Sequence, residues 1–139
     1  MKKRILFLTT LMLAITCCLN CAFAGRLATA VGTTTGGTLG KTTCAGYMTY
    51  QNYAAAGADT TTASTSTQAK GTVKAVAKIH YANSAGSRTS SSPKTDTNST
   101  YVQASITAPS GAHGYKSSSS HSYTSDSYGS WSDSLSYEY

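Results

Sequence analysis

The stretch that decides the fold is GTVKAVAKIHY, residues 71–81, because its side chains alternate in character. The apolar positions recur at every second residue and are Val73, Ala75, Ala77, Ile79 and Tyr81. The intervening positions carry Lys74, Lys78 and His80, and only Val76 departs from the pattern. Because successive residues of a β-strand point to opposite faces, this period of two predicts a strand with one buried and one solvent-facing side.

Three other segments, 42–50, 99–108 and 130–139, repeat this alternation. In the first, Cys44, Gly46, Met48 and Tyr50 share one face. The expected inward residues are Val102, Ala104, Ile106 and Ala108 in the second, and the apolar face of the third carries Trp131, Leu135, Tyr137 and Tyr139, with Asp133 as its exception. One more strand, exposed and rich in serine, is expected between residues 116 and 128. The polar, low-complexity stretches 58–70 and 84–99 are expected to be loops.

Helices find little support, since only residues 53–56 have helical composition and Gly57 follows them. Strands with a single apolar face need a second layer to cover that face. We therefore expect an all-β protein, in which residues 42–139 form one small antiparallel β-sandwich with Gly/Ser/Thr-rich loops. Residues 25–41 are small and rich in glycine, and are expected to form a flexible N-terminal arm or a poorly ordered edge segment.

Residues 1–24 have the three parts of a secretory signal peptide. Lys2, Lys3 and Arg4 give a positive start, residues 5–15 are mostly apolar, and Ala22-Phe23-Ala24 is a cleavage motif. The apolar run is too short to span a bilayer. We therefore expect cleavage after Ala24, export to the extracellular or periplasmic space, and no transmembrane segment in the mature chain.

Three of the four cysteines, Cys17, Cys18 and Cys21, fall in the segment expected to be removed. Anchoring as a lipoprotein through one of them is the less favoured alternative, because Asn20 precedes Cys21 where a small residue is needed. The spacing of Cys18 and Cys21 is that of a zinc half-site without a second ligand pair. The mature chain keeps only Cys44, which is buried, free, or paired with another chain; its strand-like context favours burial.

The net charge of the chain bears on whether its partner is a nucleic acid. The full chain carries +6, but from residue 25 onward eight Lys and Arg face five Asp and Glu, which leaves +3. This weak basicity predicts no nucleic-acid partner. Lys74, Lys78 and His80 form a modest basic face, read first as ordinary solvated surface; attraction to acidic envelope polymers or lipid headgroups is the alternative.

The chain lacks the sequence signatures of common catalytic sites. His80, His113 and His121 are the only candidates for a general base, and there is no G-x-S-x-G nucleophile elbow. His113, His121 and Asp126 do not have a spacing typical of metal ligands, and no glycine motif for phosphates leads into a helix. We therefore expect a non-enzymatic protein with no catalytic residues, cofactor or metal.

Aromatic residues crowd the C-terminal part of the chain and form a candidate binding surface. They are Tyr101, Tyr115, Tyr123, Tyr128, Trp131, Tyr137 and Tyr139. Exposed tyrosines among serines and glycines are typical of adaptable binding surfaces, and exposed strand edges favour self-association. We expect a secreted protein that binds a cell-envelope component, another protein, or itself.

The C-terminal sequence SWSDSLSYEY (130–139), with His113 and His121 upstream, resembles the lactococcin 972 group of secreted bacteriocins. The resemblance covers about a third of the chain. It implies a small exported β-sandwich that ends in an alternating aromatic strand. As an alternative function, it implies interference with envelope synthesis in a competing cell.

Overall fold

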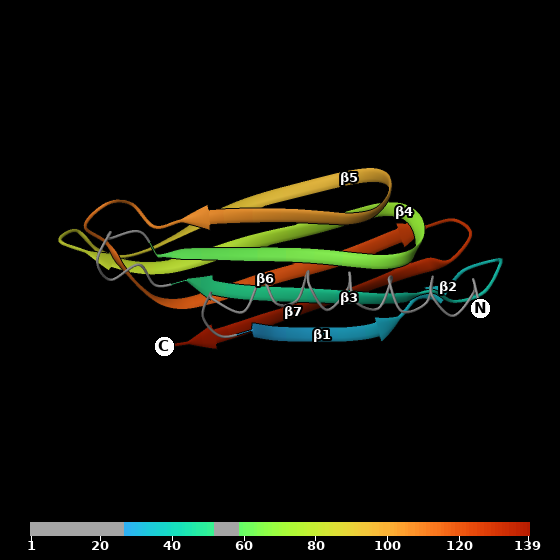
Figure 1. Cartoon of the computed structure of the whole chain (residues 1–139), viewed down its shortest axis with the longest axis horizontal. Coiled ribbons are helices and arrows are strands. Elements are labelled where there is room, and N and C mark those ends of the chain that lie inside the picture. The colour runs from blue at the N-terminus through green and yellow to red at the C-terminus, as the bar shows by residue number, and fades with distance from the viewer. Residues whose placement is uncertain (1–26, 52–58) are drawn as a thin grey trace, which may run out of the picture.

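The computed structural model describes residues 27–51 and 59–139, which form seven β-strands (Figure 1). They are β1 (Leu27–Thr33), β2 (Thr35–Gly36), β3 (Thr43–Gln51), β4 (Thr60–Asn83), β5 (Gly86–Thr107), β6 (His113–Ser125) and β7 (Gly129–Glu138). The expected signal peptide, its cysteines and residues 53–56 lie outside the described residues. No helix of the described residues has the length and apolar character needed to cross a membrane.

One antiparallel sheet contains all seven strands. Its order is β1-β3-β4-β6-β7-β2, and β5 pairs with β4. The long strand β4 changes partners along its length: its first part pairs with β3, from Thr60↔Gln51 to Thr67↔Cys44, and its second part pairs with β6. Strand β5 follows both parts of β4 along the opposite side.

Strands β4 and β5 bend together near their middles, so that the hairpin they form turns back over itself (Figure 1). The register shifts between Ser66 and Gly71, and Thr65 Oγ1 donates a 2.8 Å hydrogen bond to the Lys74 carbonyl across the bend. The bend separates two half-sheets. The neutral half-sheet comprises β1, β3 and residues 60–67 and 100–107, and these strand residues include no Asp, Glu, Lys, Arg or His. The charged half-sheet comprises residues 71–83 and 86–99, β6 and β7.

The expected all-β antiparallel fold is confirmed, but the β-sandwich is not. A single sheet runs continuously through the bend and is nearly closed, because β1 near one end of the strand order packs against β7 near the other. Gly32 of β1 lies so close to the Trp131 ring that a Cβ there would overlap it. The two faces of the core therefore belong to one curled sheet and not to two separate ones.

The expectation of loops at 58–70 and 84–99 is wrong. Most of the first stretch extends β4, and most of the second extends β5, with only a short turn between Asn83 and Gly86. Threonine is β-branched and fits a pleated surface, so threonine-rich stretches continue these strands although their composition is of low complexity.

The interior confirms the expected alternation. All five inward residues of the stretch 71–81 are buried. The other buried residues that the alternation predicted are Cys44, Gly46, Met48, Tyr50, Val102, Ala104 and Ala108. Ile106, Trp131, Leu135 and Tyr137 are half-buried, and Ile106 and Trp131 pack against the core. Tyr139, which was also expected to face inward, is 40% exposed, because it follows the end of β7 and only one end of the sheet covers it. The core thus combines small side chains with a few large ones, as the scarcity of leucine and the abundance of alanine suggest.

Two segments differ from expectation. The strand expected to be exposed at 116–128 is β6, which lies between β4 and β7 and buries Ser117, Ser119, His121 and Tyr123. Within the expected arm 25–41, β1 pairs with β3 along its whole length and β2 pairs with β7. Strand β1 also packs closely against β7, because glycine at position 32 leaves room for the Trp131 ring.

Candidate functional site

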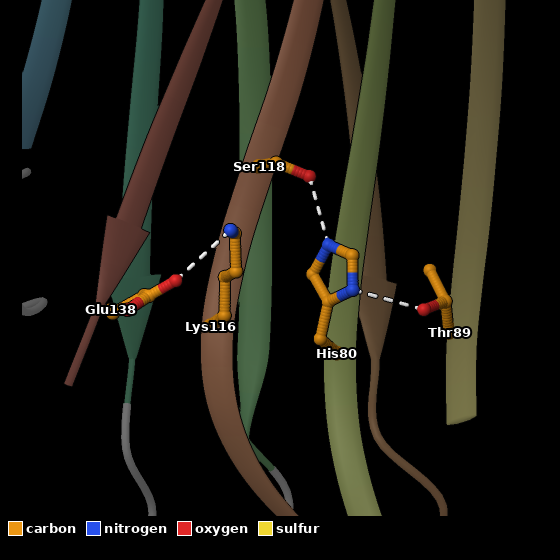
Figure 2. Close-up of polar contacts among 5 residues, drawn as sticks. All are labelled: His80, Thr89, Lys116, Ser118 and Glu138. Carbon is orange, nitrogen blue, oxygen red and sulfur yellow. Dashed lines mark hydrogen bonds and ion pairs between the residues drawn. The ribbon is translucent and has the colours of Figure 1, made fainter. Parts of the chain in front are cut away.

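A polar cluster occupies the outer face of the charged half-sheet (Figure 2). His80 of β4 lies between two neighbouring strands, with its Nδ1 2.9 Å from Thr89 Oγ1 on β5 and its Nε2 3.1 Å from Ser118 Oγ on β6. Beside it, Lys116 Nζ donates to Glu138 Oε1 at 3.0 Å. The register brings these residues together: His80 is paired with Thr89 on one side and Lys116 on the other.

The electrostatics of this cluster favour the neutral form of the His80 imidazole. Partial burial lowers the pKa of His80, and the nearby ammonium groups of Lys116 and Lys78 lower it further, while Glu138 opposes them. The Lys116–Glu138 pair is largely exposed on the Glu138 side, so its contribution to stability is small. Lys74 is exposed and Lys78 and His80 are half-buried, so the predicted basic face is a row of mixed charge and hydroxyl groups.

The Ser118–His80–Thr89 chain resembles a catalytic triad only in outline. A triad places a carboxylate behind the imidazole, whereas Thr89 supplies a hydroxyl. Ser118 lies in the middle of β6 and is paired with both Lys78 on β4 and Ser136 on β7. The backbone amides around it therefore hydrogen-bond to the neighbouring strands and are not available to form an oxyanion hole. The arrangement suits a rigid polar surface better than acyl transfer.

His121 was missed as a core residue by the sequence reasoning. It is 2% exposed, with Nδ1 2.9 Å from Thr65 Oγ1 and Nε2 2.7 Å from Ser119 Oγ. Burial lowers its pKa, and Asp133 opposes this effect. The signal was present in the sequence, because a period of two places His121 and Tyr123 on the same face as Ser117 and Ser119. Serines mask such a pattern when only apolar positions are counted.

The candidate aromatic surface is divided among different parts of the molecule. Tyr123 is fully buried, Tyr128 and Trp131 pack against the core, and Tyr137 is half-buried. Tyr101 and Tyr115 are exposed at 48% and 40% but lie on different half-sheets. The sequence reasoning did not select Tyr47 for this surface, although it is 36% exposed on β3.

Tyr139, which follows β7, contacts residues of both β3 and β6. Its ring stacks on that of Tyr50, with 3.7 Å between centroids and 19° between planes. Its hydroxyl lies 3.2 Å from Ser117 Oγ, and its amide donates to the Tyr115 carbonyl. Nearby, the buried Asp59 accepts a 2.7 Å hydrogen bond from the Gly114 amide. These contacts join β3, β6, the residue just before β4 and the C-terminal Tyr139.

Cys44 is fully buried and makes no disulfide. Burial raises the pKa of its thiol from 9.0 to about 11, so the reactive thiolate is disfavoured. Of the three alternatives for this residue, the structure therefore selects burial within the chain. Across residues 27–51 and 59–139, no three His, Cys, Asp or Glu side chains gather as metal ligands.

The open edge of β5 is the most distinctive feature for contact with other molecules. Among the described strands, β5 contacts only β4, so one side of this 22-residue strand has no neighbour. Along 86–99 the strand carries Arg88, Pro93, Lys94 and Asp96, whereas 100–107 has no charge, proline or glycine.

The chain was compared with known proteins. No family model matches it, and neither curated proteins nor solved structures contain a significant match. Functional inference therefore rests on the geometry of the chain itself.

Proposed function

We propose that the protein is exported, is not an enzyme, and acts by contact through the open edge of β5, with a second copy of the chain as its partner. The charged N-terminal start, the short apolar run and the Ala22-Phe23-Ala24 motif support export. The observation that supports the proposal most strongly concerns the open edge of β5: residues 86–99 carry charged residues and a proline, and residues 100–107 carry neither.

Natural strand edges are usually protected from pairing by charges, especially lysine, and by proline. Residues 86–99 have such protection in Arg88, Pro93 and Lys94. Residues 100–107, TYVQASIT, have none, and five of the eight are β-branched or aromatic. An unprotected neutral edge is suited to strand addition.

The partner is a second copy because the segment complements itself. In an antiparallel pair centred on Ala104, Val102 of one copy faces Ile106 of the other, and Gln103 faces Ser105. Val102, Ala104 and Ile106 already point to the interior, so pairing would continue the apolar layer from one molecule into the next. No like charges oppose each other, and the twofold arrangement is self-limiting.

Sedimentation equilibrium of the purified protein tests this proposal. We expect wild-type protein to dimerise with rising concentration, and the double variant Gln103→Lys/Ser105→Lys to stay monomeric, because it places lysines opposite each other. The matched control Thr95→Lys/Thr97→Lys adds the same charge to the protected part of β5 and should dimerise as wild type does.

Two outcomes would contradict the proposal: a wild-type protein that is monomeric at every concentration, or equal dimerisation of the two double variants. Monomer that inhibits the growth of related bacteria would instead support the antibacterial function that the C-terminal resemblance implies.

A further inference from the structure

The outer face of the neutral half-sheet is rich in hydroxyl groups. Register aligns its outward residues in rows across β1, β3, β4 and β5. One row contains Thr49, Thr62 and Ser105, and the next contains Thr29, Tyr47, Ser64 and Gln103. Neighbouring strands are joined by hydroxyl contacts, 2.9 Å between Thr60 and Thr107 and 3.1 Å between Thr62 and Ser105.

Two exposed tyrosines lie on this face. Tyr47 of β3 is paired with Ser64 and Tyr101 of β5 with Ser66, so the two rings flank the serines of β4. Strand and residue spacing put their Cα atoms roughly 12 Å apart. The Tyr101 hydroxyl donates a 2.6 Å hydrogen bond to Gln103 Oε1, two residues along the same strand. This bond holds the Tyr101 ring along the sheet surface.

We propose that this face binds a neutral polysaccharide. Hydroxyl side chains both donate and accept hydrogen bonds, as sugar hydroxyls do, and the apolar faces of sugar rings stack on tyrosine. Each tyrosine contacts a separate ring of one chain that crosses β3, β4 and β5. The serines between them bind the sugars that join those rings.

The charge distribution selects this class of ligand. Every Lys, Arg, His, Asp and Glu of the described strands belongs to the charged half-sheet or to the bend beside it. A nucleic acid or acidic polymer would need cations, which the neutral face lacks. An obligate protein interface would need a larger apolar centre, whereas Val31 is the one large aliphatic residue found exposed among the residues of this half-sheet whose burial is described.

Tyr47 belongs to β3 and lies away from the β5 edge, whereas Tyr101 belongs to the segment proposed for pairing. Tyr47→Ala therefore removes one stacking ring and leaves the edge intact. Tyr115→Ala is the matched control, since Tyr115 is equally exposed but lies near His80 on the charged half-sheet, with 6.3 Å between ring centroids.

The experiment measures depletion of the purified protein from solution by three insoluble neutral polysaccharides: microcrystalline cellulose, chitin and granular starch. We expect wild-type protein to bind at least one of them, with little effect of added salt because no ion pairs form. Tyr47→Ala and Tyr101→Ala should each weaken binding about tenfold. Tyr115→Ala should bind as wild type, and Tyr47→Ala should still dimerise.

The inference is overturned if none of the three polysaccharides depletes the wild-type protein. Binding that survives both tyrosine substitutions, or that Tyr115→Ala weakens equally, also overturns it. Thermal unfolding of each variant shows whether the fold is intact, and the exposure of these rings predicts that it is.

Discussion

At the scale of single residues, the interior depends on the fit between Gly46 and His121. A Cβ on Gly46 would lie 2.5 to 2.9 Å from three atoms of the His121 ring. The ring cannot yield easily, because Thr65 and Ser119 hold its two nitrogens. Glycine at this position therefore serves packing on the buried face of β3, where any side chain would meet the imidazole.

The substitution Gly46→Ala tests this fit. We expect it to lower the free energy of unfolding by about 1–3 kcal/mol, the usual cost of overpacking a core. Urea denaturation measures the loss. Ala45→Ser, on the opposite face of the same strand, should leave stability nearly unchanged. Wild-type stability in Gly46→Ala would contradict the position of the His121 ring.

The protonation of His121 predicts how stability depends on pH. Because its pKa is lowered in the folded state, the folded protein binds fewer protons than the unfolded chain, in which histidine titrates near pH 6.5. Stability should therefore be full above that pH and fall as the pH drops below it. The Asp133 carboxylate reduces the effect without reversing it, and His80 contributes in the same direction.

We expect a lower melting temperature near pH 5 than near pH 7.5. His121→Gln should remove more of this pH dependence than His80→Gln, since His80 is less buried. Melting curves of the three proteins at both pH values provide the comparison. An unchanged pH dependence in His121→Gln would show that another group controls acid stability.

At the scale of elements, the last residue anchors β7. Tyr139 stacks on Tyr50 of β3 and contacts Ser117 of β6, so it ties the end of the chain to two other strands. Burial raises the pKa of the Tyr139 hydroxyl, consistent with its position between strands.

Tyr139→Ala should reduce the unfolding free energy by about 1–2 kcal/mol, because it removes an aromatic stack and its buried area. Thermal unfolding measures this effect. Tyr115→Ala is the control, because Tyr115 is as exposed as Tyr139, at 40%, but its ring is not stacked on another tyrosine. Equal stability of both variants would mean that the stack contributes nothing.

The sequence predicted which residues of the clear strands face inward, because a period of two is a local property. It could not locate the strand ends. Thr60–Lys70 and Gly86–Ser99 are rich in polar residues. Only the pairing of the first stretch with β3 and β5, and of the second with β4, shows that they are strands. Nor could it show the single curled sheet, since the bend in β4 and β5 depends on contacts between distant residues such as Thr61 and Ser117.

The candidate site was predicted less well than the fold. The outward position of Lys74, Lys78 and His80 follows from alternation. The cluster around His80 does not, because Thr89, Lys116 and Ser118 come from strands whose register the sequence leaves open. Similarly, counting tyrosines could not separate Tyr123, a core residue, from Tyr101, a surface residue.

At the scale of the whole molecule, export is the first premise of the proposed function. We expect the secreted protein to begin at Gly25 and to carry one cysteine, and Ala24→Gln to retain the N-terminal segment by blocking cleavage. Intact-mass spectrometry of protein from the medium and from cells measures this. A lipid-modified mass would instead support the lipoprotein alternative.

The central claim is that copies of the molecule meet at residues 100–107 of β5. Amides of a strand alternate between its two neighbours, so in the monomer only those paired with β4 are protected from hydrogen exchange. Measuring exchange of individual amides at low and high protein concentration tests the claim most directly. We predict that the remaining amides of 100–107 gain protection as concentration rises, while 86–99 stay unchanged. Protection that does not depend on concentration, or that increases at another strand, would contradict it.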